Sequence, residues 1–299
     1  MQMISVQNVC KSFGDTLVLD NISFSADPGE IYGLIGYNGV GNTTLMKIMA
    51  GIYRPDKGNV SAGDAPIYEN TEKKKQCFFM TEEATYFEQS SLNEMRKFYK
   101  GYYENWSDKT FYGLVNIFEV DPQLKISRYS KGMQRQAALS LAFATHSKYM
   151  FLDEAFDGLD YSVRKTMREL LKYYAKAKEA ILIVSSHNLS ELENLADKIG
   201  MLNHGELVFD DSTKYMREKF CSCRFKKNTD VINLDRLNVQ LEEDDGDSIY
   251  CVLECGKDEA YTYLRDKGVE DIAIRSVRLE EYFRTERKEK RIDWEEIFE

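Results

Sequence analysis

Residues 36–44 have the sequence Gly-Tyr-Asn-Gly-Val-Gly-Asn-Thr-Thr and lie between an apolar run over 31–35 and a second apolar segment over 45–50. Strand, glycine-rich turn and helix in this order surround a phosphate group with backbone N–H groups and a helix N-terminus. The spacing of this glycine loop (residues 36–44) matches the pattern G-x-x-x-x-G-K-[ST] at every position but one, where Asn42 replaces the lysine. The sequence therefore predicts a phosphate cradle without its usual cation.

Two later apolar runs predict a parallel β-sheet. Residues 149–152 lead into Asp153 and Glu154, and residues 181–184 lead towards His187, with helical sequence between the two runs. Uninterrupted apolar strands separated by a helix are typical of a parallel sheet that is buried on both faces. Because functional groups in such sheets collect at the carboxyl ends of the strands, these three polar residues should meet the glycine loop at one edge.

The polar residues at this edge fit phosphoryl transfer to water, which needs a phosphate cradle, magnesium and a positioned water. Thr43 is placed to bind magnesium through its hydroxyl, with Thr44 beside it facing the phosphates. Asp153 is the expected magnesium carboxylate, and Glu154 is the expected general base for the attacking water. His187 would hold the γ-phosphate and the water; alone it would more often be structural, but its company favours this role.

Composition and charge limit the classes of partner. The chain has 299 residues, of which 43% are hydrophobic and 30% charged, as in an ordinary soluble globular protein. The net charge of −10 disfavours nucleic acid as the main partner, because that affinity comes largely from Lys and Arg on phosphates. The sequence has no long apolar run and no signal peptide, so we expect a cytosolic chain that does not itself span a bilayer.

The six cysteines are scattered along the chain, which indicates reduced thiols. Four of them leave a zinc site open as an alternative to ordinary buried thiols: Cys221, Cys223, Cys251 and Cys255. Their spacing differs from the C-x2-C pairs of zinc modules, so the sequence favours buried thiols.

From about residue 86 to residue 127 the sequence becomes helical and rich in aromatic residues. Asn93 and Ser107 are candidate helix starts. The aromatic side chains would either fill the core of a small helical subdomain or line an exposed groove for a partner helix.

Motifs after the glycine loop occur in the order found in one protein family. Residues 129–136 (Tyr-Ser-Lys-Gly-Met-Gln-Arg-Gln) resemble its signature motif, residues 151–154 its Walker B motif, residues 156–160 its D-loop and His187 its switch histidine. Over residues 1 to about 215 the chain is therefore similar to the nucleotide-binding subunit of an ATP-binding-cassette (ABC) transporter. The signature motif is the most specific element, because it separates this family from other P-loop NTPases.

This resemblance implies an α/β fold with two domains. Residues 1–215 would form a P-loop NTPase (ABC ATPase) core with an inserted helical subdomain over about 84–145. Residues 216–299 would form a small α+β accessory domain, for which no residue-by-residue match exists.

The resemblance also implies that two cassettes pair head to tail around two ATP molecules with Mg²⁺. Glu154, His187 and Glu82, which stands at the Q-loop position, would be catalytic. Thr43, Asp153 and Glu82 would meet the metal. The implied ATP contacts, with the signature residues supplied by the opposite chain, are Phe13, Gly36, Tyr37, Asn38, Gly39, Val40, Gly41, Asn42, Thr43, Thr44, Ser130, Gly132 and Asp160.

The form Ser-Lys-Gly-Met in the signature motif resembles exporter cassettes encoded apart from their membrane subunits. Integral membrane subunits would then dock on the helical subdomain and the Glu82 segment, which gives the groove interpretation of the aromatics more weight. The chain would be cytoplasmic and peripheral on the inner face of the cell membrane. The sequence names neither the transported substrate nor the second cassette.

Two residues depart from the family pattern. Glu82 keeps an oxygen where the family has glutamine, so we expect function to survive. Asn42 removes a charged hydrogen bond worth about 1.5–3 kcal/mol, which predicts roughly tenfold to hundredfold weaker nucleotide binding. A lost donor to developing charge predicts a turnover about 10²–10³ lower. Asn42 fits a natural degenerate site or an engineered substitution, and the intact Glu154 and His187 favour the second.

A different class of function stays open as the alternative. The chain would then be an ATP-responsive regulatory or binding module without a membrane partner and with a degenerate ATPase site. A purely structural subunit is disfavoured by the intact carboxylates and histidine.

Overall fold

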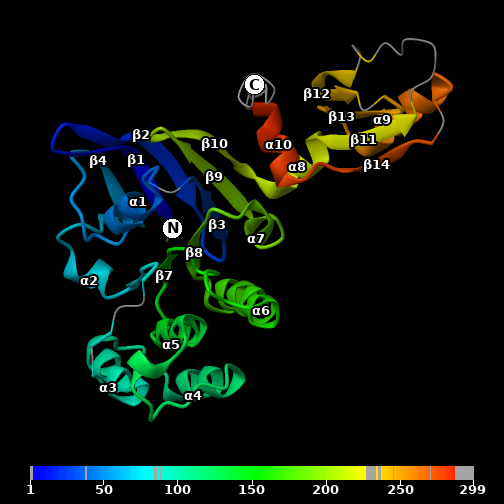
Figure 1. Ribbon diagram of the computed structural model, residues 1–299. Helices are drawn as coiled ribbons and strands as arrows, with labels where there is room; N and C mark the ends of the chain where they lie inside the picture. Colours follow the sequence, from blue (N-terminus) through cyan, green and yellow to red (C-terminus); the bar gives the residue numbers. More distant parts are fainter. Residues whose placement is uncertain are drawn as a thin grey trace, which may run out of the picture. The chain divides into compact units, whose positions relative to one another are not determined.

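The computed structural model describes residues 3–37, 39–83, 86–87, 89–226, 234, 237–244, 246–269 and 271–286. The chain forms two compact units, Met1–Asp211 and Ser212–Glu299, and Figure 1 shows their helices and strands. The first unit contains two sheets and the second contains one, and each unit has its own apolar core.

The centre of the first unit is a six-stranded sheet of order β10-β9-β3-β8-β7-β6. The strands from β9 to β6 are all parallel, and all residues of β3, β7 and β8 are buried. This confirms the predicted α/β fold with a parallel sheet. The strands are β3 (Ile31–Ile35), β6 (Cys77–Met80), β7 (Tyr149–Leu152), β8 (Ile181–Ser186), β9 (Lys198–Asn203) and β10 (Glu206–Ser212).

A second, antiparallel sheet of order β2-β1-β4-β5 belongs to the same unit. It contains β1 (Ile4–Phe13), β2 (Thr16–Ala26), β4 (Lys57–Ala62) and β5 (Ala65–Pro66). The alternation suggests three short strands before residue 30, but two long strands form instead. The two apolar segments after residue 16 both belong to β2. Between them Asn21 has a left-handed backbone and the pairing with β1 shifts register, so the side-chain alternation breaks within a continuous strand.

Helix α1 (Asn42–Met49) packs its apolar residues into the core shared with both sheets. The other helices of the unit are α2 (Thr71–Lys74), α3 (Leu92–Tyr102), α4 (Asp108–Ile117), η1 (Ile126–Arg128), α5 (Lys131–Ala144), α6 (Tyr161–Lys178) and α7 (Leu189–Glu193).

Helices α3 and α4 pack against α5, and the three lie together in Figure 1. Ser107 caps α4, as the sequence predicts, but α3 begins one residue before Asn93 because Ser91 and Glu94 form a capping box. The aromatic residues divide between the two interpretations: Phe111 is fully buried, whereas Phe98 and Tyr102 are exposed.

The second unit has an antiparallel sheet of order β12-β13-β11-β14. Helix α9 covers the sheet's core with Ala260 and Leu264. Its elements are α8 (Thr213–Lys219), β11 (Cys221–Lys226), β12 (Val239–Asp244), β13 (Ser248–Leu253), α9 (Lys257–Asp266), β14 (Ala273–Ser276) and α10 (Leu279–Glu286).

Two sequence expectations differ here. The acidic run over 242–247 is typical of a solvated turn between strands, but residues 242–244 belong to β12 because they pair with β13. The sequence over 277–299 predicts a charged helix with apolar residues on one face. The structure shows α10 over Leu279–Glu286, and residues 287–299 lie outside the described residues.

The four cysteines of the second unit are buried free thiols. Cys223 lies directly opposite Cys251 on neighbouring strands, with 3.0 Å between their sulfur atoms. Within the described ranges, which include all four of these cysteines, no group of three or more His, Cys, Asp or Glu side chains is placed to hold a metal ion. Nor does any helix in those ranges have the length and apolar character needed to cross a bilayer.

Candidate nucleotide-binding site

The glycine loop connects the end of β3 to the start of α1. Gly39 and Gly41 have positive φ angles of 82° and 121°, which glycine adopts without the strain of a side chain. A Cβ at Gly36 would collide with the Val40 side chain. No side chain caps the N-terminus of α1, so its first N–H groups remain for an anion. Asn38 lies outside the described residues.

The loop forms one side of a cavity of about 410 Å³. Residues from β1 and β2 and from the segments that follow β6 and β7 complete it, so strand ends far apart in the sequence converge here. The lining residues are Phe13, Val18, Gly36, Tyr37, Gly39, Gly41, Asn42, Thr43, Thr44, Glu82, Asp153 and Glu154. Phe13 presents a ring that is 46% exposed and is held at its edge by Tyr53.

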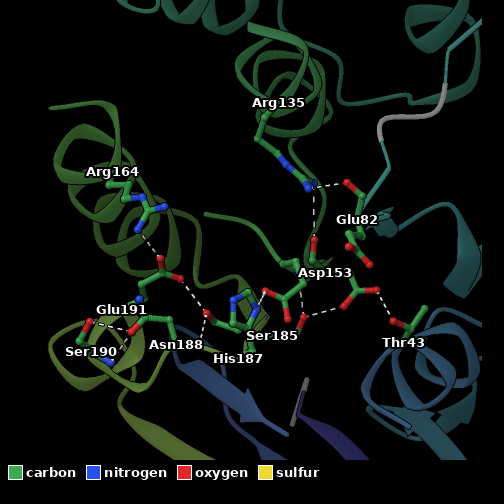
Figure 2. Close-up of polar contacts among 12 residues, drawn as sticks. Thr43, Glu82, Arg135, Asp153, Arg164, Ser185, His187, Asn188, Ser190 and Glu191 are labelled. Atoms are coloured by element: carbon green, nitrogen blue, oxygen red, sulfur yellow. Dashed lines mark hydrogen bonds and ion pairs between the residues drawn. The ribbon is translucent and has the colours of Figure 1, made fainter. Parts of the chain in front are cut away.

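A chain of short hydrogen bonds beside the loop fixes the Asp153 carboxylate and the backbone of Glu154 (Figure 2). The Thr43 hydroxyl donates to Asp153 Oδ2 over 2.6 Å, and the Ser185 hydroxyl donates to Asp153 Oδ1 over 2.6 Å. Ser185 Oγ also accepts from the Glu154 N–H over 2.9 Å. Both oxygens of the buried Asp153 are therefore held in place.

Glu154 and His187 meet at the ends of β7 and β8. His187 Nδ1 lies 2.9 Å from Glu154 Oε2. Burial raises the pKa of Glu154 above its usual 4.5, and the neighbouring His187 partly opposes this shift. A carboxylate with a raised pKa is a better proton acceptor, so Glu154 suits general-base chemistry.

Arg135 of α5 is a buried cation that sequence reasoning missed. Its guanidinium donates to the carbonyl oxygens of Thr81 at 2.9 Å, Asp153 at 3.5 Å and Glu82. Burial lowers its pKa. The arginine therefore joins α5 to the ends of β6 and β7. The sequence signal that could have indicated this role is the position of a charged residue among the apolar residues of α5.

The side chain of Asn42 folds towards the first residue of its own loop. Both terminal atoms would lie 3.0 Å from a Cβ at Gly36. Its Oδ1 is buried without a hydrogen-bond partner, which is a costly arrangement for a polar atom. At the position where the pattern has a cation, the loop thus carries a neutral and unsatisfied amide.

Comparisons with known proteins agree on one family. The ABC transporter family pattern matches residues 19–157. An uncharacterized ABC transporter ATP-binding protein of Methanocaldococcus jannaschii is 30% identical over 69% of this chain and 76% of its own.

The chain belongs to the ATP-binding proteins of ABC transporters.

Two further relatives of this ABC cassette cover more of its length. The ABC transporter ATP-binding protein YtrB of Bacillus subtilis is 23% identical over 94% of this chain and 97% of its own. The Nod factor export ATP-binding protein I of Rhizobium sp. strain N33 is 26% identical over 83% and 85%. A solved ATP-binding subunit of an ABC transporter shares the fold, with a TM-score of 0.66 and 24% identity over 72% of this chain and 92% of that one.

Four expected nucleotide contacts of the cassette among the described residues do not line the cavity: Val40 of the glycine loop and three residues from the signature motif and D-loop. Ser130 is exposed and caps α5 by accepting from the Met133 N–H. Gly132 packs so closely on the D-loop that a Cβ would lie 2.8 Å from the Gly158 carbonyl oxygen. Asp160 is exposed and caps α6. Within one chain these last three residues therefore act as helix caps and packing positions.

The cavity's donors fit a nucleoside triphosphate with Mg²⁺. The loop amides and the uncapped N-terminus of α1 suit phosphate oxygens. Thr43 and Asp153 offer two oxygen atoms already 2.6 Å apart. Magnesium commonly takes few protein ligands and completes its shell with water and substrate phosphates, so this small donor set is sufficient.

Proposed function

We propose that this cassette binds ATP between two paired cassettes and thereby powers a membrane transporter that exports its substrate. The observation that carries the proposal is the hydrogen-bonded series from Thr43 through Asp153 and Ser185 to Glu154 and His187 beside the glycine loop. These residue types at these strand ends supply what phosphoryl transfer to water requires. The family supports ATP binding and hydrolysis in general.

We assign roles to Phe13, the loop and the carboxylates of the cavity, and to His187 beside Glu154. The exposed ring of Phe13 stacks on adenine, and the loop amides with Thr44 hold the phosphates. Thr43 and Asp153 hold Mg²⁺, which when bound neutralises phosphate charge, and Glu82 reaches the same region. Glu154 accepts a proton from the attacking water, and His187 donates a hydrogen bond to the γ-phosphate.

The second cassette completes each site in this proposal. In this proposal Ser130, Gly132 and Asp160 contribute from the opposite chain. Support comes from their absence from the lining of their own chain's cavity and from the exposure of Ser130 and Asp160. Membrane subunits would dock on the helical subdomain near Phe98 and Tyr102. This places the cassette in the cytoplasm at the inner face of the membrane, and the Nod factor export relative supports the export direction.

Asn42 makes this chain a poor ATPase in our proposal. The loop backbone and the carboxylates are intact, but no described cation occupies the lysine position of the loop. The alternative, a regulatory ATP-responsive module without a membrane partner, keeps weak binding but needs no transport subunit. Extraction of membranes in detergent distinguishes the two: co-purification of an integral membrane subunit supports transport, and its absence supports the alternative.

The direct test of the site is Asn42→Lys. The restored ammonium would supply the missing charged hydrogen bond, so we expect ATP affinity to rise roughly tenfold to hundredfold and turnover to rise about 10²–10³-fold. Calorimetric ATP titration and phosphate release measure the two effects. The matched control is Lys57→Asn, which alters a lysine outside the cavity. A turnover that stays negligible in Asn42→Lys would overturn the assignment of this residue as the defect.

A further inference from the structure

We propose that Arg164 and Glu191 form a positioning pair that sets the backbone on both sides of His187 and links it to the D-loop. The inference rests on the proposed role of His187 at the γ-phosphate, which it deepens. Neither residue lines the nucleotide cavity, so both act through other groups rather than on the substrate.

Arg164 joins the first part of α6 to two different segments. Its Nε donates to the Leu159 carbonyl oxygen of the D-loop over 2.8 Å, and its Nη1 donates to Glu191 Oε1 over 2.7 Å. Figure 2 shows the guanidinium reaching from α6 towards Glu191. The fixed fork of an arginine allows both bonds at once, whereas a lysine offers one compact charge.

Glu191 of α7 uses its second oxygen for the segment that carries His187. Ser186 Oγ donates to Glu191 Oε2 over 2.7 Å, and the Asn188 N–H donates to Ser186 Oγ over 3.0 Å. His187 stands between these two residues. The bonds therefore hold its backbone from both neighbours and leave its ring directed at Glu154.

Burial makes the pair costly to break. Glu191 is 7% exposed and Ser186 is 1% exposed. Removing Arg164 would leave the Glu191 carboxylate in this environment without its ion-pair partner, and such a charge draws in water or shifts its contacts. The expected response is a rearrangement of Ser186 and Asn188, which moves the His187 ring away from Glu154.

The test is NMR of the histidine rings, because the chain has only three histidines. The full chain is labelled with ¹⁵N-histidine. The ring resonances that are missing from the spectrum of the His187→Gln variant are assigned to His187. We expect Arg164→Met and Glu191→Gln each to shift the His187 ring nitrogens, and the double variant to give no larger shift than either single variant. Lys165→Met, an exposed neighbour on α6, should leave them unchanged.

Arg164→Lys separates the two arms of the pair. The lysine can still neutralise Glu191 but loses the simultaneous bond to Leu159. We therefore expect the His187 ring-nitrogen shifts of Arg164→Lys to lie closer to those of the unchanged chain than those of Arg164→Met do. An unchanged His187 spectrum in folded Arg164→Met, or shifts that simply add in the double variant, would overturn the proposal. Because these spectra need no nucleotide, a failure of ATP to bind would count against the proposed function and leave this inference standing.

Discussion

At Glu154, the ionised form that suits catalysis is also the form that burial disfavours. Its backbone is left-handed, with φ of 46°, and its carboxyl is largely buried beside His187. Burial disfavours the charged form and raises the pKa. Ionisation that would help catalysis therefore weakens the folded state, as expected where a functional group is held in an unfavourable environment.

The pH dependence of stability follows from that shift. Because the folded pKa lies above the unfolded value near 4.5, the folded chain binds the proton more tightly, and stability is lost as pH rises through the raised pKa. Glu154→Gln should therefore raise the melting temperature at pH 7, and the gain should vanish below about pH 4.5. Thermal unfolding from pH 4 to 8 measures this, with the exposed Glu169→Gln as control. A gain of equal size at every pH would contradict it.

At the scale of an element, helix α5 brings the signature motif against the D-loop. Its second residue, Gly132, lies against the Gly158 backbone, where a side chain has no room. The same position thus serves the monomer's structure, whatever it contributes to a paired cassette.

Two glycine-to-alanine substitutions in neighbouring helices should have opposite effects. Gly132→Ala would force α5 away from the D-loop, so we expect a loss of about 1–3 kcal/mol. Gly113→Ala in α4 meets no atom within 4 Å and should gain about 0.5–1 kcal/mol from the lower backbone entropy of the unfolded chain. Denaturant unfolding compares them. Equal effects from both substitutions would show that the close contact with Gly158 does not govern stability.

The elements also show what sequence could predict. The apolar runs before Asp153 and His187 predict the parallel strands, and the strand ends converge as expected. Ser185 and Arg135 escaped prediction because their importance comes from partners more than 15 residues away. A serine at the end of an apolar run gives no sign that it will bridge Asp153 and the Glu154 backbone.

At the scale of the whole molecule, the two units have separate cores. The first core surrounds both sheets and α1, and the second gathers the cysteines with α9. Domains with their own cores unfold as their own cooperative units unless strongly coupled. The family comparison supplies the chemistry of the first unit, whereas the second unit has no residue with a proposed catalytic role.

Unfolding of the full chain should therefore show two transitions. Leu264→Ala, in the fully buried α9 position, should cost about 2–5 kcal/mol in the second unit alone. Mg²⁺ and ATP should raise the midpoint temperature of the first unit's transition, because a ligand stabilises the unit that binds it. Calorimetry with each change separately tests the assignment. One shared transition that moves with both changes would show that the units unfold together.

The buried amide of Asn42 bears on how readily mutation could return a lysine to the glycine loop. Asparagine and lysine codons differ only in their third base, so a single base change exchanges one residue for the other. No described group forms a hydrogen bond with Asn42 Oδ1, so that atom anchors nothing whose loss would penalise the exchange. In a population carrying this gene, the proposed hydrolytic activity would thus lie one point mutation away.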